Sequence, residues 1–258
     1  MEGATVVKVG GNEVDDPTWT ARLAAAVAAS PRGVVVVHGG GKEVTDLQRA
    51  LGAEPEWSEG LRVTTPAALR AVSMVLSGIV NKRLVAALIG AGVTAAGISG
   101  EDGPTLEAVP ARGGQLGRTG QISEVRTGLL HALLDHGIIP VVSPVSRGPD
   151  GGALNVNADD SASAVASALH ARRFLVVSNV PGVLRDGQRI PRVTTEELEV
   201  LISSGVASGG MVPKLRAAMR AARAGVQEVR IGGLNLLSDP EAGTTIVRQE
   251  LPAASPRT

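Results

Sequence analysis

The stretch that decides the fold is residues 33–42, Gly33-Val34-Val35-Val36-Val37-His38-Gly39-Gly40-Gly41-Lys42. Four consecutive valines are typical of a parallel strand that is buried on both faces. The three glycines are followed by a helical pattern from Glu43, and free N–H groups at a helix N-terminus bind anions. The stretch therefore predicts a strand, an anion-binding turn and a helix, although a flexible loop is the simpler alternative for a glycine run.

A second strand pattern precedes this one, at Thr5 to Val9, and the residues between them have helical spacing after Asp16-Pro17. Strand, helix and strand in this order favour a parallel sheet. The same alternation continues along the chain. Further strands are predicted at 94–98, 138–142, 174–178, 226–231 and 244–247, and helices at 43–51, 66–76, 79–90, 125–136, 159–170, 195–203 and 214–224. Residues 101–122 lack a helical period and predict hairpins or a lid. The fold class is α/β.

Composition excludes several classes of protein. The 258 residues carry 25 basic and 25 acidic side chains, so there is no basic field for nucleic acid. The absence of cysteine excludes disulfides and thiolate metal sites, and the four histidines lack metal-ligand spacing. No segment has the pattern of a signal peptide or 18 consecutive apolar residues. We expect a cytoplasmic protein with no membrane partner, no nucleic-acid partner and no metal site made by the protein alone.

Two lysines stand where a cation is unfavourable without an anionic partner. Lys8 lies inside a valine-rich strand and is followed by Gly10-Gly11. Burying a charge is costly unless it is paired. Lys214 follows Gly209-Gly210 and falls in the first turn of a predicted helix, where the helix dipole disfavours a cation. Both positions favour an anionic ligand; for Lys8 the alternative is a side chain that extends to the surface.

Three polar segments complete the candidate site. Asn155, Asn157 and Asp159 alternate before an Ala-rich helix, and capping needs only one of them. Arg62 lies in a loop, where an arginine can hold a carboxylate through two hydrogen bonds, although most loop arginines are solvated. The segment Ser178 to Val183 follows a strand at the sheet edge where open α/β sheets bind ligands, and a plain turn is its alternative.

Taken in order, these segments resemble the amino-acid kinase family over nearly the whole chain. The motifs that carry the resemblance are VKVGG, VVVHGGGK, GLRVT, LSGIVNKRLV, GISGEDG, PVVSPV, LNVNADDSA, SNVPGV, GGMVPK and GTTIV. The resemblance implies a three-layer αβα sandwich with an open, mainly parallel central sheet. It also implies an N-terminal lobe (1–170) that binds the phosphoryl acceptor and forms the dimer, and a C-terminal lobe (171–258) that binds ATP.

The resemblance also assigns roles to residues, motif by motif. It implies that Lys8 and Lys214 neutralise the transferring phosphoryl group and that Asp159 holds both ammonium groups. Acceptor contacts are implied for Gly40, Gly41, Leu61, Arg62, Asn155 and Asn157. Nucleotide contacts are implied for Gly10, Gly11, Ser178, Asn179, Gly182, Gly210 and Met211. Mg²⁺ is expected to enter bound to the ATP phosphates.

Within the family, the segments GLRVT and NVNAD resemble the enzymes that phosphorylate N-acetyl-L-glutamate. Asn179 and the segment NKRLV look more like the kinase of lysine biosynthesis, whose acceptor is an aminoadipate on a carrier protein. A non-catalytic regulatory protein on the same fold is the alternative from another class, but Lys8, Asp159 and Lys214 are all present. Since Lys8 lies so near Met1, we expect a homodimer without the N-terminal helix that links hexameric relatives.

Overall fold

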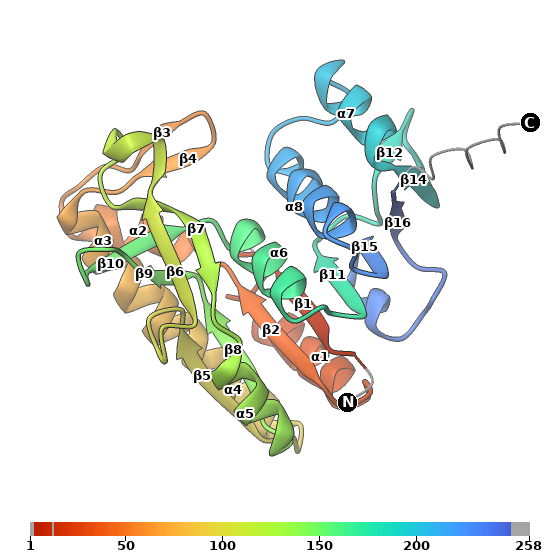
Figure 1. The fold of residues 1–258 in the computed structure, drawn as a ribbon, viewed down its shortest axis with the longest axis horizontal. Coiled ribbons are helices and arrows are strands. Elements are labelled where there is room, and N and C mark those ends of the chain that lie inside the picture. Colours follow the sequence, from red (N-terminus) through yellow and green to blue (C-terminus); the bar gives the residue numbers. More distant parts are fainter. Residues whose placement is uncertain (1–2, 12, 249–258) are drawn as a thin grey trace, which may run out of the picture.

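The computed structural model describes residues 3–11 and 13–248, and it is built around one eight-stranded sheet (Figure 1). All neighbouring strands are parallel except β15 and β16. In order across the sheet, the strands are β14 (Arg192–Thr194), β16 (Thr244–Val247), β15 (Glu228–Gly232), β11 (Arg173–Val177), β1 (Thr5–Val9), β2 (Val34–His38), β8 (Ile139–Ser143) and β5 (Ala95–Ser99). The predicted strands are all present within two residues of their expected bounds.

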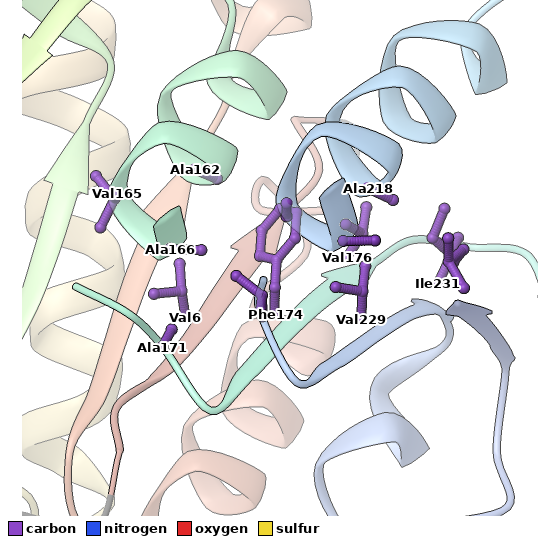
Figure 2. Packing of buried hydrophobic residues seen from close by; sticks show 14 of the residues in the cluster. Val6, Ala162, Val165, Ala166, Ala171, Phe174, Val176, Ala218, Val229 and Ile231 are labelled. Atoms are coloured by element: carbon purple, nitrogen blue, oxygen red, sulfur yellow. The ribbon is translucent and has the colours of Figure 1, made fainter. Parts of the chain in front are cut away.

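Helices cover both faces of this sheet, as the alternation of side chains along β1 shows. Val6 belongs to a buried cluster that includes residues of α5 (Gly128–Asp135), α6 (Ala158–Ala168), α7 (Thr195–Ser203) and α8 (Met211–Arg223). Val7 and Val9 pack with the opposite layer, which includes α1 (Pro17–Ala28), α2 (Gly41–Ala50) and η3 (Leu234–Leu237). Figure 2 shows Phe174 and Val176 of β11 beneath α6 and α8. The predicted three-layer αβα sandwich with an open, mainly parallel sheet is confirmed.

The longest helix differs from its prediction. Two helices were expected over 66–76 and 79–90, but α3 (Pro66–Ser73), the π-helical turn η1 (Met74–Val80) and α4 (Asn81–Gly90) form one continuous helix. By length and composition alone this helix could cross a membrane. Its inner face joins the core on the α1 side of the sheet. Gly78 interrupted the pattern in the sequence, whereas the π turn accommodates it without ending the helix.

The polar region at 101–122 forms strands outside the main sheet, as predicted. Strands β6 (Leu106–Pro110) and β7 (Thr119–Val125) pair antiparallel, with the short helix η2 (Ala111–Gly114) between them. With β9 (Val145–Arg147) and β10 (Ala153–Val156) they close a small barrel. Two hairpins complete the fold: β3 (Glu56–Ser58) with β4 (Leu61–Val63), and β12 (Leu184–Arg185) with β13 (Gln188–Arg189). Thus β10 leads into α6, and β4 carries Arg62.

Candidate active site

A cavity of about 350 Å³ opens at the carboxyl ends of three adjacent strands. Strand β1 lies between β2 and β11, and the three strands end in Gly10-Gly11, Gly39 to Gly41 and Ser178-Asn179. Ligands bind open α/β sheets at this edge, where connections leave the sheet in opposite directions. The turn predicted from the valine and glycine run thus forms one wall of the cavity.

A buried ion pair lies at the floor of the cavity. Lys8 Nζ is 2.9 Å from Asp159 Oδ1, and the two residues are only 4% and 7% exposed. Lys8 shares the face of β1 that carries Val6, so its side chain points toward α6. Asn157 caps this helix because its Oδ1 accepts the Asp159 N–H at 2.7 Å. The cap and the first turn of α6 therefore hold Asp159 against Lys8.

Lys214 reaches the same cavity from α8. It lies in the first turn of that helix, after Gly210 at the N-cap, and its Nζ donates to Gly210 O at 2.9 Å. Burial and the positive charge of Lys8 lower the pKa of Lys214, while Asp159 and Glu13 act in the opposite direction. The cavity therefore holds two ammonium groups whose mutual repulsion an anion would relieve.

The glycines form a cradle of backbone N–H groups. A Cβ on Gly11 would lie 2.6 Å from Gly40 N and 2.8 Å from Gly41 N, so only glycine allows the two turns to come this close. Within residues 3–11 and 13–248, the amides of Gly40 and Gly41 have no protein acceptor. They are available to an anion at the N-terminus of α2.

Arg62 forms the other end of the cavity and is only 6% exposed. Its guanidinium donates to Gln48 Oε1 at 2.9 Å, to Thr45 Oγ1 at 2.7 Å and to Gly41 O at 3.2 Å. It also stacks on Trp57, 4.5 Å from the ring centroid. Burial lowers its pKa, and no carboxylate of the described chain pairs with it. A buried cation held only by neutral groups is suited to an anionic ligand.

Most residues predicted for the site come together in this cavity. The lining includes Lys8, Gly10, Gly11, Gly40, Gly41, Leu61, Arg62, Asn155, Asn157, Asp159, Ser178, Asn179, Gly210 and Lys214. Asn155 donates to Thr64 Oγ1 at 3.0 Å, while Asn157 acts as the helix cap that the simpler explanation required. Gly182 and Met211 are not in the lining: Gly182 packs on Thr244, and Met211, the first residue of α8, packs on the core.

Other lining residues were not predicted. Glu13 lies over Gly10, whose Cβ would come within 2.5 Å of Glu13 Oε2. An acidic residue two positions after a diglycine is the signal that could have identified it. Trp57 contributes through its contact with Arg62, and its antiparallel pairing with Arg62 across a short hairpin is visible only in the fold. Thr45 and Gln48 have i, i+3 spacing on α2, which is compatible with a shared partner but does not identify Arg62.

Comparisons with known proteins find relatives that match nearly the whole chain. A model of the amino acid kinase family matches residues 3–233. The acetylglutamate kinase of Roseiflexus sp. (strain RS-1) is 50% identical over 249 residues, 96% of this chain and 94% of that protein. The acetylglutamate kinase of Chloroflexus aurantiacus (strain ATCC 29366 / DSM 635 / J-10-fl) is 45% identical over 254 residues, 97% of this chain and 99% of that protein.

Among solved structures, N-acetylglutamate synthase from Neisseria gonorrhoeae, complexed with coenzyme A and N-acetyl-glutamate, superposes with a TM-score of 0.84 at 26% identity. The match covers 97% of this chain and 60% of that one, so it extends over the sheet and both helical layers. With the family model matching most of its length, the chain belongs to the amino acid kinase family.

Proposed function

We propose that this chain transfers the γ-phosphoryl group of ATP to the side-chain carboxylate of N-acetyl-L-glutamate, giving N-acetylglutamyl 5-phosphate for arginine biosynthesis. The observation that carries the proposal is the convergence of Lys8, Lys214 and the glycine cradle at one cavity. Cations and N–H donors in this arrangement neutralise the charge that spreads over phosphoryl oxygens during transfer. The acceptor follows from the relatives, which are acetylglutamate kinases at 45–50% identity over nearly the whole chain.

The reaction needs no general base. A carboxylate oxygen of the acceptor attacks the γ-phosphorus, the bond from that phosphorus to the β,γ-bridging oxygen breaks, and ADP leaves with the electron pair. Lys8 and Lys214 reach the site from β1 and α8, so each is placed to neutralise phosphoryl oxygens. Asp159 keeps Lys8 in position through their 2.9 Å contact.

The acceptor binds in this proposal at the Arg62 end of the cavity. Arg62 is charged, buried and free of a carboxylate partner in the described chain, so it would take the α-carboxylate of the acyl amino acid. Asn155 donates a hydrogen bond to Thr64, two residues after Arg62, and also lines the cavity. Its side-chain amide would therefore contact the acceptor near Arg62. Gly40, Gly41, Leu61 and Asn157 complete this subsite in our proposal.

The nucleotide occupies the opposite end, beside Ser178, Asn179, Gly210 and Lys214, with Gly182 and Met211 farther out. The described residues include no group of three or more metal-ligating side chains, so Mg²⁺ would arrive on the phosphates. Glu13 and Asp159 are the two carboxylates in the lining, and Asp159 is occupied by Lys8. This leaves Glu13 to face the metal, which would supply charge neutralisation at the phosphates.

We further propose two lobes and a cytoplasmic homodimer. Residues 1–170 carry the acceptor contacts, and residues from 171 onward carry most nucleotide contacts. The long helix 66–90 exposes the apolar side chains of Met74, Ile79 and Ile89, which a second copy could cover. Light scattering tests the assembly: a dimer mass supports the proposal, and a hexamer contradicts it.

The central experiment measures ATP-dependent turnover with N-acetyl-L-glutamate, using hydroxylamine to trap the acyl phosphate. Glutamate and N-acetylaminoadipate serve as acceptor controls. Trapped product with N-acetylglutamate, and little with the controls, supports the proposal. Silence with N-acetylglutamate and turnover of an aminoadipate on its carrier protein would move the chain to lysine biosynthesis.

A further inference from the structure

A buried histidine lies directly beneath the glycine cradle. His38 is the last residue of β2, and none of its surface is exposed. Its Nδ1 atom is 2.9 Å from Gly39 O, and its Nε2 atom is 3.1 Å from Asn81 Nδ2. The ring therefore connects the turn that binds the anion to the start of α4, on the interior side of the turn.

These two contacts define the protonation state of the ring. A carbonyl oxygen only accepts, so the contact with Gly39 requires a proton on Nδ1. The Asn81 amide nitrogen only donates, so Nε2 must be unprotonated. A neutral ring agrees with the pKa of His38, which is lowered to about 4, chiefly by burial. The hydrogen bond to Gly39 acts in the opposite direction, and the charge of Lys82 acts in the same direction as burial.

The orientation of Asn81 is fixed independently of His38. Its Nδ2 carries two hydrogens, and the two shortest contacts of this atom are to Val141 O at 2.9 Å and to His38 Nε2 at 3.1 Å, whereas Ile98 O is 3.3 Å away. Its Oδ1 accepts from Lys82 Nζ at 3.2 Å. Gly97 on β5 provides the space for this amide, because a Cβ there would lie 1.9 Å from Asn81 Oδ1. An asparagine held by β8 and α4 thus selects one tautomer of the histidine.

His38 affects the cavity through the peptide unit that joins Gly39 to Gly40. In a planar trans peptide, the C=O of one residue and the N–H of the next point in opposite directions. Because Gly39 O is held by the buried ring, the Gly40 N–H turns away from the ring, on the side of Gly11 and the cavity. A histidine that only filled space in the core would not need this hydrogen bond.

We propose that His38 is a positioning residue: held by Asn81 as the neutral Nδ1–H tautomer, it fixes the Gly39–Gly40 peptide so that the Gly40 amide donates to the transferring phosphoryl group. The proposal rests on the phosphoryl-transfer function proposed above. The proposal explains why two polar side chains, His38 and Asn81, are paired in the core although both are fully buried.

Two matched variants separate positioning from packing. In His38→Asn the amide nitrogen stands near the place of Nδ1, whereas in His38→Gln it stands near the place of Nε2. Both remove the ring, and His38→Asn leaves the larger cavity, so a loss of packing alone would make His38→Asn the more damaging variant. We expect His38→Gln to lower kcat by about tenfold to a hundredfold with little change in KM, and His38→Asn to stay within about threefold of the native kcat. Equal losses in both variants would overturn the proposal.

Two readouts do not depend on turnover. Nitrogen-15 NMR of the native protein should show His38 as the neutral Nδ1–H tautomer from pH 6 to 9, and an Nε2–H tautomer or an imidazolium would refute the mechanism.

Binding of ADP with aluminium fluoride, which mimics the transferring group, should weaken about tenfold or more in His38→Gln and not in His38→Asn. If native protein bound this probe but did not phosphorylate N-acetylglutamate, the acceptor assignment would fail and the positioning proposal would stand. Equal binding of the probe by both variants would overturn the positioning proposal itself.

Discussion

Lys8 Nζ and Asp159 Oδ1 lie 2.9 Å apart, although 150 other residues separate them in the chain. This contact joins the middle strand of the sheet to the first turn of α6. Breaking one member of a buried pair leaves an uncompensated charge. We predict that Asp159→Asn lowers the free energy of unfolding by roughly 3 to 5 kcal/mol. Urea unfolding measures this loss. The double variant Lys8→Met/Asp159→Leu should regain stability but not turnover; a double variant as unstable as the single one would contradict the pairing.

Substitution of Lys214 should affect stability differently from substitution of Asp159. Burial and the charge of Lys8 depress its pKa, so the folded state disfavours its charged form. We predict that Lys214→Met leaves stability at pH 7 unchanged or higher while lowering kcat by about a hundredfold to a thousandfold. Urea unfolding and initial-rate kinetics on the same preparation test both parts. A loss of stability equal to that of Asp159→Asn would show that Lys214 has a structural role.

The same depressed pKa predicts an alkaline limit to activity. Loss of the Lys214 proton removes a cation from the site, so kcat/KM should fall at a pH below 10.5, the ordinary lysine value. For stability the sign is opposite: as pH rises through the folded pKa toward 10.5, the contribution of Lys214 to the free energy of unfolding increases. A pH–rate profile tests the first part. Lys214→Arg should move the limit upward, since arginine stays protonated, and an unmoved limit would assign it to another group.

Arg62 and Trp57 offer a graded test of acceptor binding. Removal of a charged hydrogen-bonding partner should raise the KM for N-acetylglutamate by roughly a hundredfold in Arg62→Leu. Trp57→Ala removes only the stacking contact at 4.5 Å and should raise it by about threefold. The KM for ATP serves as the internal control and should not change. An equal rise in both KM values would place Arg62 outside the acceptor subsite.

The main sheet could be predicted from local patterns because its central strands are short runs of apolar, mostly β-branched residues. The runs Thr5 to Val9 and Val34 to Val37 are buried on both faces, so they read as continuous apolar segments, and Asp16-Pro17 marks the start of α1. The continuous helix 66–90 was harder to predict. Gly78 and Ser77 resemble a break, and the π turn that carries the helix across them depends on packing against the core.

The candidate site was predicted where one residue type was costly in its local setting, as with Lys8 in a valine strand. The contacts of His38 and Asn81 were not predicted, because they join β2 to a helix more than forty residues away and depend on the space left by Gly97. The stacking of Trp57 on Arg62 likewise depends on the register of the hairpin formed by the two three-residue strands β3 and β4. Pairings of this kind are set by the assembled fold rather than by either segment.

Strand β1 is hydrogen-bonded along its whole length to β2 on one side and to β11 on the other. The acceptor-binding and nucleotide-binding parts that we propose are therefore joined through paired strands of the sheet rather than by a single hinge peptide. Any change in their relative orientation must appear as torsion of the sheet about β1, spread over five paired residues on each side. Lys8 lies on β1 itself, where a twist about that strand would displace atoms least, so the ammonium group that we propose neutralises the phosphoryl oxygens would move less than the outer walls of the cavity.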